Sequence, residues 1–140
     1  MIAMVPAVHS SGMDVPNPKA GEPVSEYGGN PAGFIVKVKD GPTFYHTGDT
    51  AYFSDIKLIG SMYHPDVALV NIGGHFGMSP QMAARAAKDV GAKIAIPHHF
   101  KTFPILTQDP SLFTKALQGP IGMVMTPGQT LIFDGKNVKR

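Results

Sequence analysis

The stretch His46-Thr47-Gly48-Asp49-Thr50 is the part of this 140-residue sequence that decides its fold. Residues 43–46 are expected to form a strand, and the Gly-Asp pair after it holds a carboxylate at a fixed point in a loop. Two further segments, Ala7-Val8-His9-Ser10-Ser11 and Pro97-His98-His99-Phe100, each place a histidine after a predicted strand. Imidazole nitrogen and carboxylate oxygen suit zinc or a similar divalent ion, and such a site can activate water. The three segments therefore indicate a metallohydrolase-type site that includes Asp49.

The composition is that of one globular domain. Hydrophobic residues make up 43% of the chain, enough for a single core. No apolar run approaches the roughly 18 residues of a membrane-spanning helix, and no signal-peptide pattern is present, so we expect a cytoplasmic location without membrane contact. Cysteine is absent, so any metal site must be built from His, Asp and Glu.

Charge gives no sign of a nucleic-acid partner. The formal net charge is only +2, and the basic residues are scattered along the chain. Their one tight group lies at the C-terminus and is expected to be a solvated tail: Lys136, Lys139 and Arg140. We therefore expect a small-molecule substrate rather than a nucleic acid.

Apolar runs, turn signals and helix caps predict an order of strands and helices. Strands are expected at residues 2–8, 33–39, 43–46, 67–72, 93–96, 121–125 and 130–133. Helices are expected over residues 55–62 with Ser54 as cap, from Ser79-Pro80 to residue 90, and from Asp109-Pro110 to residue 117. Residues 10–31, rich in Gly, Pro, Ser and Asn, read as a long surface loop. This order predicts an α+β fold, with a mixed sheet and helices on one face.

The three acidic and imidazole positions are far apart in sequence, yet each follows a predicted strand. Ligands of layered α/β folds commonly lie at the loop ends of strands, so His9, Asp49 and His99 could share one edge of the sheet. Simpler interpretations stay open for each residue. Asp49 could be an ordinary turn residue, and His9 a loop histidine bonded to backbone. His98 and His99 are adjacent in an extended segment and point in opposite directions, so at most one of them faces a given metal.

Six segments, taken in order, resemble the C-terminal half of metallo-β-lactamase-fold hydrolases, in the branch related to ascorbate-phosphate lactonases. Together they cover nearly the whole chain. They are Ala7-Val8-His9-Ser10-Ser11, Gly28-Gly29-Asn30-Pro31-Ala32-Gly33-Phe34, His46-Thr47-Gly48-Asp49-Thr50, Asn71-Ile72-Gly73-Gly74-His75-Phe76-Gly77-Met78-Ser79-Pro80, Pro97-His98-His99-Phe100, and Thr102-Phe103-Pro104 with Gln108-Asp109-Pro110. The resemblance implies half of an αββα sandwich.

The same resemblance implies roles for individual residues. His9 matches a terminal ligand of the first metal, Asp49 the catalytic carboxylate that bridges two metals, and His99 the last histidine ligand, because it precedes the aromatic Phe100. The remaining polar residues would line the site or support its ligands: His46, His75, His98 and Ser79. His46 could instead be a strand-packing residue. Gly77 departs from the family, which usually has Thr there.

The defining motif of the superfamily, His-x-His-x-Asp-His, does not occur in these 140 residues. We therefore expect residues 1–140 to be the C-terminal half of a metal-dependent hydrolase whose N-terminal half is a separate chain or a missing segment. The complete site would hold two divalent ions, most simply zinc, with manganese or iron as alternatives. Its activated water would attack an ester, lactone or phosphoester. The alternative is a catalytically inactive half-domain that acts as an oligomerising or metal-binding module. Either form is expected to be an oligomer.

Overall fold

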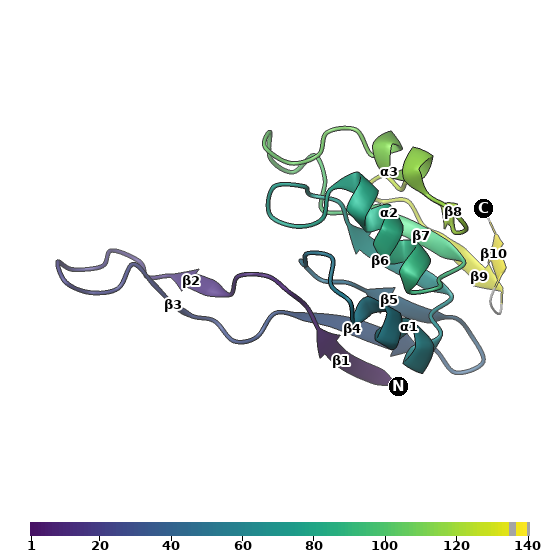
Figure 1. The fold of residues 1–140 in the computed structure, drawn as a ribbon, viewed down its shortest axis with the longest axis horizontal. Helices are drawn as coiled ribbons and strands as arrows, with labels where there is room; N and C mark the ends of the chain where they lie inside the picture. Colours follow the sequence, from purple (N-terminus) through teal and green to yellow (C-terminus); the bar gives the residue numbers. More distant parts are fainter. Residues whose placement is uncertain (135–136, 140) are drawn as a thin grey trace.

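The computed structural model describes residues 1–134 and 137–139 (Figure 1). The predicted solvated tail lies mostly outside the described residues, which leave out Lys136, Arg140 and the side chain of Lys139. The strands are β1 Ile2–Pro6, β2 Gly12–Asp14, β3 Ser25–Tyr27, β4 Ala32–Lys37, β5 Thr43–His46, β6 Val67–Asn71, β7 Ile94–His98, β8 Ile121–Gly122, β9 Ile132–Asp134 and β10 Asn137–Lys139. The helices are α1 Ile56–Tyr63, α2 Pro80–Asp89 and α3 Ser111–Ala116.

One mixed sheet organises the chain, with the strand order β1-β4-β5-β6-β7-β8. β1, β4 and β5 pair antiparallel, joined in part by the predicted hairpin turn at Asp40-Gly41. β5, β6, β7 and β8 are parallel, because helices α1, α2 and α3 return the chain to the same end after each strand. The predicted α+β class with a mixed sheet is confirmed.

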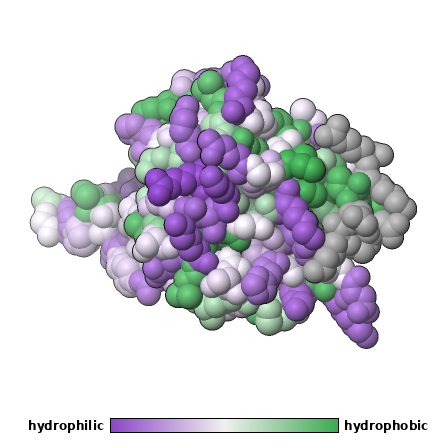
Figure 2. Space-filling model, turned by 45° about the vertical axis from the view of Figure 1, so that its right-hand side comes forward, coloured by the Kyte–Doolittle hydropathy of each residue, from purple (hydrophilic) through white to green (hydrophobic). Residues whose placement is uncertain are grey.

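All three helices cover the same face of the sheet (Figure 1), as predicted. The core between them is closely packed. The sheet contributes Val5, Ile35, Tyr45, Ala68, Val70 and Ala95, and the helices contribute Ile56, Ile59, Ala83, Ala84, Ala86, Ala87 and Phe113. Small alanines on α2 bring that helix close to the strands. Its solvent side is polar, and Figure 2 shows a largely hydrophilic surface there.

The opposite face of the sheet is only partly covered. Over β5, β6 and β7 the C-terminal segment packs on it, and the rings of Phe44 and Phe133 meet there edge to face at 5.3 Å. Over β1 and β4 the apolar residues that alternate with the core are exposed: Ile2, Met4, Phe34 and Val36. We call these four residues the open apolar face.

Two local predictions are wrong. Residues 10–31 are not a plain loop: β2 and β3 pair within them as an exposed hairpin that projects from the body (Figure 1). Ser54 does not cap α1, because Asp55 holds the N-cap position and its side chain accepts no capping hydrogen bond from the helix. Ser54 Oγ instead donates to the Asp55 carboxylate. By contrast, Ser79 caps α2 as predicted by accepting the Met82 amide at 3.3 Å. None of the described helices is long and apolar enough to cross a lipid bilayer.

Candidate metal centre

The predicted ligands all follow strands that end at one edge of the sheet. β5 and β7 run parallel to each other and to β6, and β1 points the same way because two antiparallel pairings separate it from β5. His9, Asp49 and His99 therefore lie at the same end of the sheet, where β1, β5 and β7 finish. However, β1 and β7 are four positions apart in the sheet, about 19 Å at the usual strand spacing. Their loops must bend inward for the three residues to meet.

Asp49 and His99 do meet. Asp49 Oδ2 lies 3.4 Å from His99 Nε2, with the Asp49 side chain 47% exposed and the His99 side chain 29% exposed. Two ligands that share a tetrahedral zinc through bonds of 2.0–2.1 Å are about 3.3 Å apart. The observed spacing therefore fits two neighbouring ligands of one ion, and the partial exposure leaves that ion within reach of a substrate.

His99 is held in an unusual backbone conformation that aims its ring at Asp49. Its φ of 58° is in the left-handed region, which is uncommon outside glycine and is frequent at functional sites. The ring packs against Gly73, where an added Cβ would lie 2.8 Å from His99 Nδ1. That Nδ1 atom is buried and has no hydrogen-bond partner among the described residues. On its Nδ1 side, the ring is therefore held by packing rather than by a polar contact.

His9 points elsewhere. Its Nδ1 is 2.8 Å from the Ser10 carbonyl and its Nε2 is 2.7 Å from the Phe76 carbonyl. Both nitrogens face oxygen acceptors, so neither presents a free lone pair to a metal in this arrangement. Within the described ranges, no group of three or more His, Cys, Asp or Glu residues is arranged to hold an ion. The structure therefore brings together two of the three predicted ligands, and the complete set stays a prediction.

Beneath Asp49, the Gly48 corner is fixed by hydrogen bonds. The Gly48 amide donates to His46 Nδ1 at 3.0 Å. The Thr47 hydroxyl donates to the Gly48 carbonyl at 2.8 Å and accepts the Asn71 amide at 3.2 Å. Gly48 has a φ of 64°, and an added Cβ would collide with the Ala32 carbonyl, so only glycine fits. The corner that holds the carboxylate is therefore rigid.

His46 and His98 form a pair on the side of the sheet away from the helices, with ring centroids 4.4 Å apart. Burial first, and the neighbouring His46 second, lower the pKa of His98 from 6.5 to about 4. Burial also lowers the pKa of His46, although the Asp49 charge opposes that shift. Both rings are therefore neutral near pH 7. Since His46 Nδ1 accepts a hydrogen bond, its proton is on Nε2.

The other predicted site residues have different surroundings. His75 is exposed, stacks edge to face on Phe76 at 4.5 Å, and lies in the loop that contacts His9. Ser79 is committed to capping α2. His98 and His99 point to different partners, His46 and Asp49, as predicted. The cause is the left-handed backbone at His99 rather than the expected extended one.

Sequence reasoning missed three buried polar residues around the corner. Three residues are at most 1% exposed: Thr47, Thr50 and Asn71. The side-chain amide of Asn71 lies directly against Gly77. Thr47 and Thr50 lie within the stretch His46-Thr47-Gly48-Asp49-Thr50. The sequence signal that could have identified this hydrogen-bonded cluster is the pair of threonines on either side of Gly48-Asp49. Buried hydroxyls are stable only with hydrogen-bond partners, so such a pair indicates polar neighbours.

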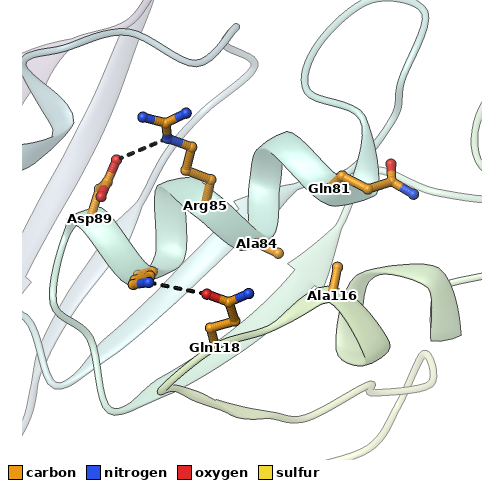
Figure 3. Close-up of a pocket in the computed structure, with 7 residues that line it drawn as sticks. Gln81, Ala84, Arg85, Asp89, Ala116 and Gln118 are labelled. Atoms are coloured by element: carbon orange, nitrogen blue, oxygen red, sulfur yellow. Dashed lines mark hydrogen bonds and ion pairs between the residues drawn. The ribbon is translucent and has the colours of Figure 1, made fainter.

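A groove lies between α2 and α3 and is lined by none of the predicted site residues (Figure 3). Its charged groups are paired: Arg85 Nε is 3.6 Å from Asp89, and Lys88 donates to Gln118 at 3.1 Å. Ala84 and Ala116 supply its apolar part. Because these charges are already paired, the groove reads as a helix–helix contact and not as a ligand site.

Comparison with known proteins identifies the family. A family model described as the beta-lactamase superfamily domain matches residues 1–100. The chain belongs to this superfamily. A UPF0173 metal-dependent hydrolase of Thermodesulfovibrio yellowstonii is 50% identical over 117 residues, which cover 83% of this chain and 42% of that protein. The chain spans about half the length of the curated relatives that it matches.

Solved structures of the superfamily support the fold. Igni18, a metallo hydrolase of Ignicoccus hospitalis, superposes with a TM-score of 0.75 at 36% identity, covering 91% of this chain and 50% of its own. YhfI of Bacillus subtilis, described as a metallo-beta-lactamase fold protein, gives a TM-score of 0.59 at 16% identity, with 91% and 48% coverage. The metallo-β-lactamase fold is thus confirmed. The link to ascorbate-phosphate lactonases stays a prediction.

Proposed function

We propose that this chain is the C-terminal half of a metal-dependent hydrolase that acts on an ester, lactone or phosphoester of a small molecule. The observation that carries the proposal is the 3.4 Å approach of Asp49 Oδ2 to His99 Nε2 at the common edge of the sheet. It is supported by the metal-dependent hydrolase names of the relatives. Asp49 and His99 would hold the ion, and His9 would join them after release from the Phe76 carbonyl.

The residues present fit this role in chemistry as well as spacing. A divalent ion at this site would supply a Lewis acid that activates water. Asp49 would orient the attacking water, since its carboxylate is partly exposed and its backbone is fixed at Gly48. The neutral His46 and His98 rings add no positive charge that would repel a cation. We infer zinc, with manganese or iron as alternatives, and two ions in the complete site.

The open apolar face supports the need for a second half. Ile2 and Met4 are each 73% exposed, and Phe34 and Val36 are 44% and 36% exposed. Contiguous exposed apolar residues of this kind mark interaction surfaces. Since the relatives are about twice as long, we propose that their remaining segment, as a separate or connected polypeptide, packs on this face. The cytoplasmic location, expected from the sequence, stays a prediction.

One alternative is favoured by a specific observation. The described residues form no three-ligand metal group, which suits a catalytically inactive half-domain that uses the open apolar face to form oligomers. A metal-binding but non-catalytic module lies between the two. These possibilities differ in whether hydrolysis appears once the second half is supplied.

The test is reconstitution. The chain would be co-expressed with the part of the Thermodesulfovibrio relative that it does not match, and the complex assayed for lactone and phosphodiester hydrolysis. We expect activity in the complex, none in either part alone, and loss on Asp49→Ala. His64→Ala, at an exposed position at the end of α1, serves as the histidine control and should leave activity unchanged. Activity that survives Asp49→Ala would overturn the assignment, and an inactive, oligomeric complex would favour the structural module.

A further inference from the structure

The two threonines beside the Gly48-Asp49 corner are buried although the carboxylate between them is open. Thr47 is 1% exposed and Thr50 is 0% exposed, whereas the Asp49 side chain is 47% exposed. Burying a hydroxyl is costly unless it is hydrogen-bonded. The partners of these two hydroxyls therefore show which parts of the molecule the corner is fastened to.

Thr47 fastens the corner to the strands on the His99 side. Its hydroxyl donates a hydrogen bond to the Gly48 carbonyl at 2.8 Å, and its oxygen accepts one from the backbone amide of Asn71 at the end of β6. The same oxygen lies 3.4 Å from His98 Nε2 at the end of β7. Because the hydroxyl has only one proton, His98 must donate in this contact, which places the His98 proton on Nε2. Thr47 thus links the Asp49 corner to the residue before His99.

Thr50 fastens the corner to the His9 side. Its oxygen accepts the Val8 amide at 2.9 Å, and its hydroxyl donates to the Ala51 carbonyl at 2.8 Å. The Ala51 amide in turn donates to the Val8 carbonyl at 2.8 Å. Val8 directly precedes His9, so Thr50 links Asp49 to the His9 segment across 42 residues of sequence.

We propose that Thr47 and Thr50 are positioning residues that hold the Asp49 carboxylate between the His9 and His99 segments. Neither hydroxyl points to the open side of the site, and each acts through backbone atoms of a neighbouring ligand segment. The role in metal binding rests on the proposed function, while the role in fixing Asp49 does not. The loss of either hydroxyl should loosen one side of the corner without removing a ligand.

The experiment compares Thr47→Val and Thr50→Val with Thr47→Ser and Thr50→Ser, which keep the hydroxyl. Thr43→Val is the matched control, because Thr43 is also buried but lies at the other end of β5. Should a valine variant fail to fold, the alanine variant replaces it, since it leaves room for a water at the lost hydroxyl. Folding of each variant is checked by thermal unfolding.

Two readouts separate positioning from simple stability. Amide exchange by NMR should quicken about tenfold at Asn71 in Thr47→Val and at Val8 in Thr50→Val. Zn²⁺ affinity of the chain should fall roughly 10- to 100-fold in the valine variants, the range seen when groups that support metal ligands are lost. The serine variants and Thr43→Val should stay within about threefold of the wild type. Valine variants that lose amide protection but keep wild-type Zn²⁺ affinity would overturn the proposal, as would unchanged amide exchange.

A wild-type chain that binds no Zn²⁺ would count against the proposed function and leave this inference to a second measurement. Three-bond scalar couplings then report the χ1 rotamer of Asp49. We expect one rotamer in the wild type, the serine variants and Thr43→Val, and averaging in the valine variants. Equal averaging in all of them, or in none, would contradict a positioning role.

Discussion

The two faces of the central sheet differ in how completely this chain covers them. One face packs under three helices, with Ile35 and Tyr45 at most 1% exposed. On the other face, the residues on either side of Ile35 in β4, Phe34 and Val36, are exposed. In an antiparallel sheet with one solvated face, the outward residues are usually polar. The apolar open face therefore indicates that this side is built for burial, although the described chain does not bury it.

The candidate site lies at the end of the sheet where β5 and β7 finish, between its two faces. Asp49 and His99 are held by packing and hydrogen bonds from the covered side. His46 and His98, on the other side of the sheet, also contact the Asp49 corner, through the Gly48 amide and the Thr47 hydroxyl. In the proposed function, the well-packed half would supply a rigid part of the metal centre, and a second segment would complete it from the open side.

The largest expected effect contrasts adjacent residues on β4. Ile35→Ala leaves a cavity in the closely packed core, so it should lower the free energy of unfolding by about 2–5 kcal/mol. Phe34→Ala, one residue away on the open apolar face, should lower it by less than about 1 kcal/mol. Urea unfolding of both variants measures the contrast. Similar losses at the two positions would show that the open face is already covered in the isolated chain.

At the edge, Gly48→Ala tests whether the site is as closely packed as the core. The added Cβ would meet the Ala32 carbonyl, and the left-handed backbone disfavours any side chain. We expect a loss of about 2 kcal/mol or more in the free energy of unfolding. Gly128→Ala shares a positive φ but has open space around it, so it is the control. Equal losses would mean that only backbone strain, and not the Ala32 contact, constrains the corner.

The open apolar face should matter for assembly rather than for stability. Phe34→Glu places a charge there, and we expect it to weaken association with the complementary segment at least about tenfold, as for a central interface residue. Lys37→Glu, a charge change at the exposed end of β4, is the control. Titration calorimetry measures both. An unaffected affinity for Phe34→Glu would place the interface elsewhere.

The smallest effect concerns Tyr45. Its buried hydroxyl has no hydrogen-bond partner among the described residues, and burial raises its pKa from 10.0 to about 12. Tyr45→Phe should therefore leave stability unchanged or raise it by up to about 1 kcal/mol at pH 7. A raised pKa gives stability that is complete below pH 10.0 and lost as the pH rises to about 12. The wild type should lose that increment in alkaline urea titrations and the variant should not. A destabilised variant would reveal a partner for the hydroxyl.

The sequence predicted what depends on local chemistry. The Ser79-Pro80 start of α2 was correct because a cap and an N-terminal proline act within one turn. The strands β6 and β7, the second of which leads to His99, were correct because buried parallel strands are continuous apolar runs. The β2–β3 hairpin was missed because its strands have three residues each, all exposed, and carry no hydrophobic period.

The site was only partly predictable for a related reason. The approach of Asp49 to His99 followed from strand order, which the alternation of elements indicates. The contacts of His9 with Phe76, and of Thr50 with Val8, join residues 67 and 42 positions apart in loops. Loop paths of that kind depend on the packed structure, so no local pattern encodes them.

The proposed metal centre is tested most directly by the metal content of the complex between this chain and the complementary segment of its relatives. Elemental analysis after purification should find bound divalent metal in the wild-type complex, and Asp49→Ala and His99→Ala should each remove most of it. His64→Ala should retain it. A complex that assembles but contains no metal, or one whose metal content is unchanged by Asp49→Ala, would contradict the claim that these 140 residues contribute one side of a metal centre.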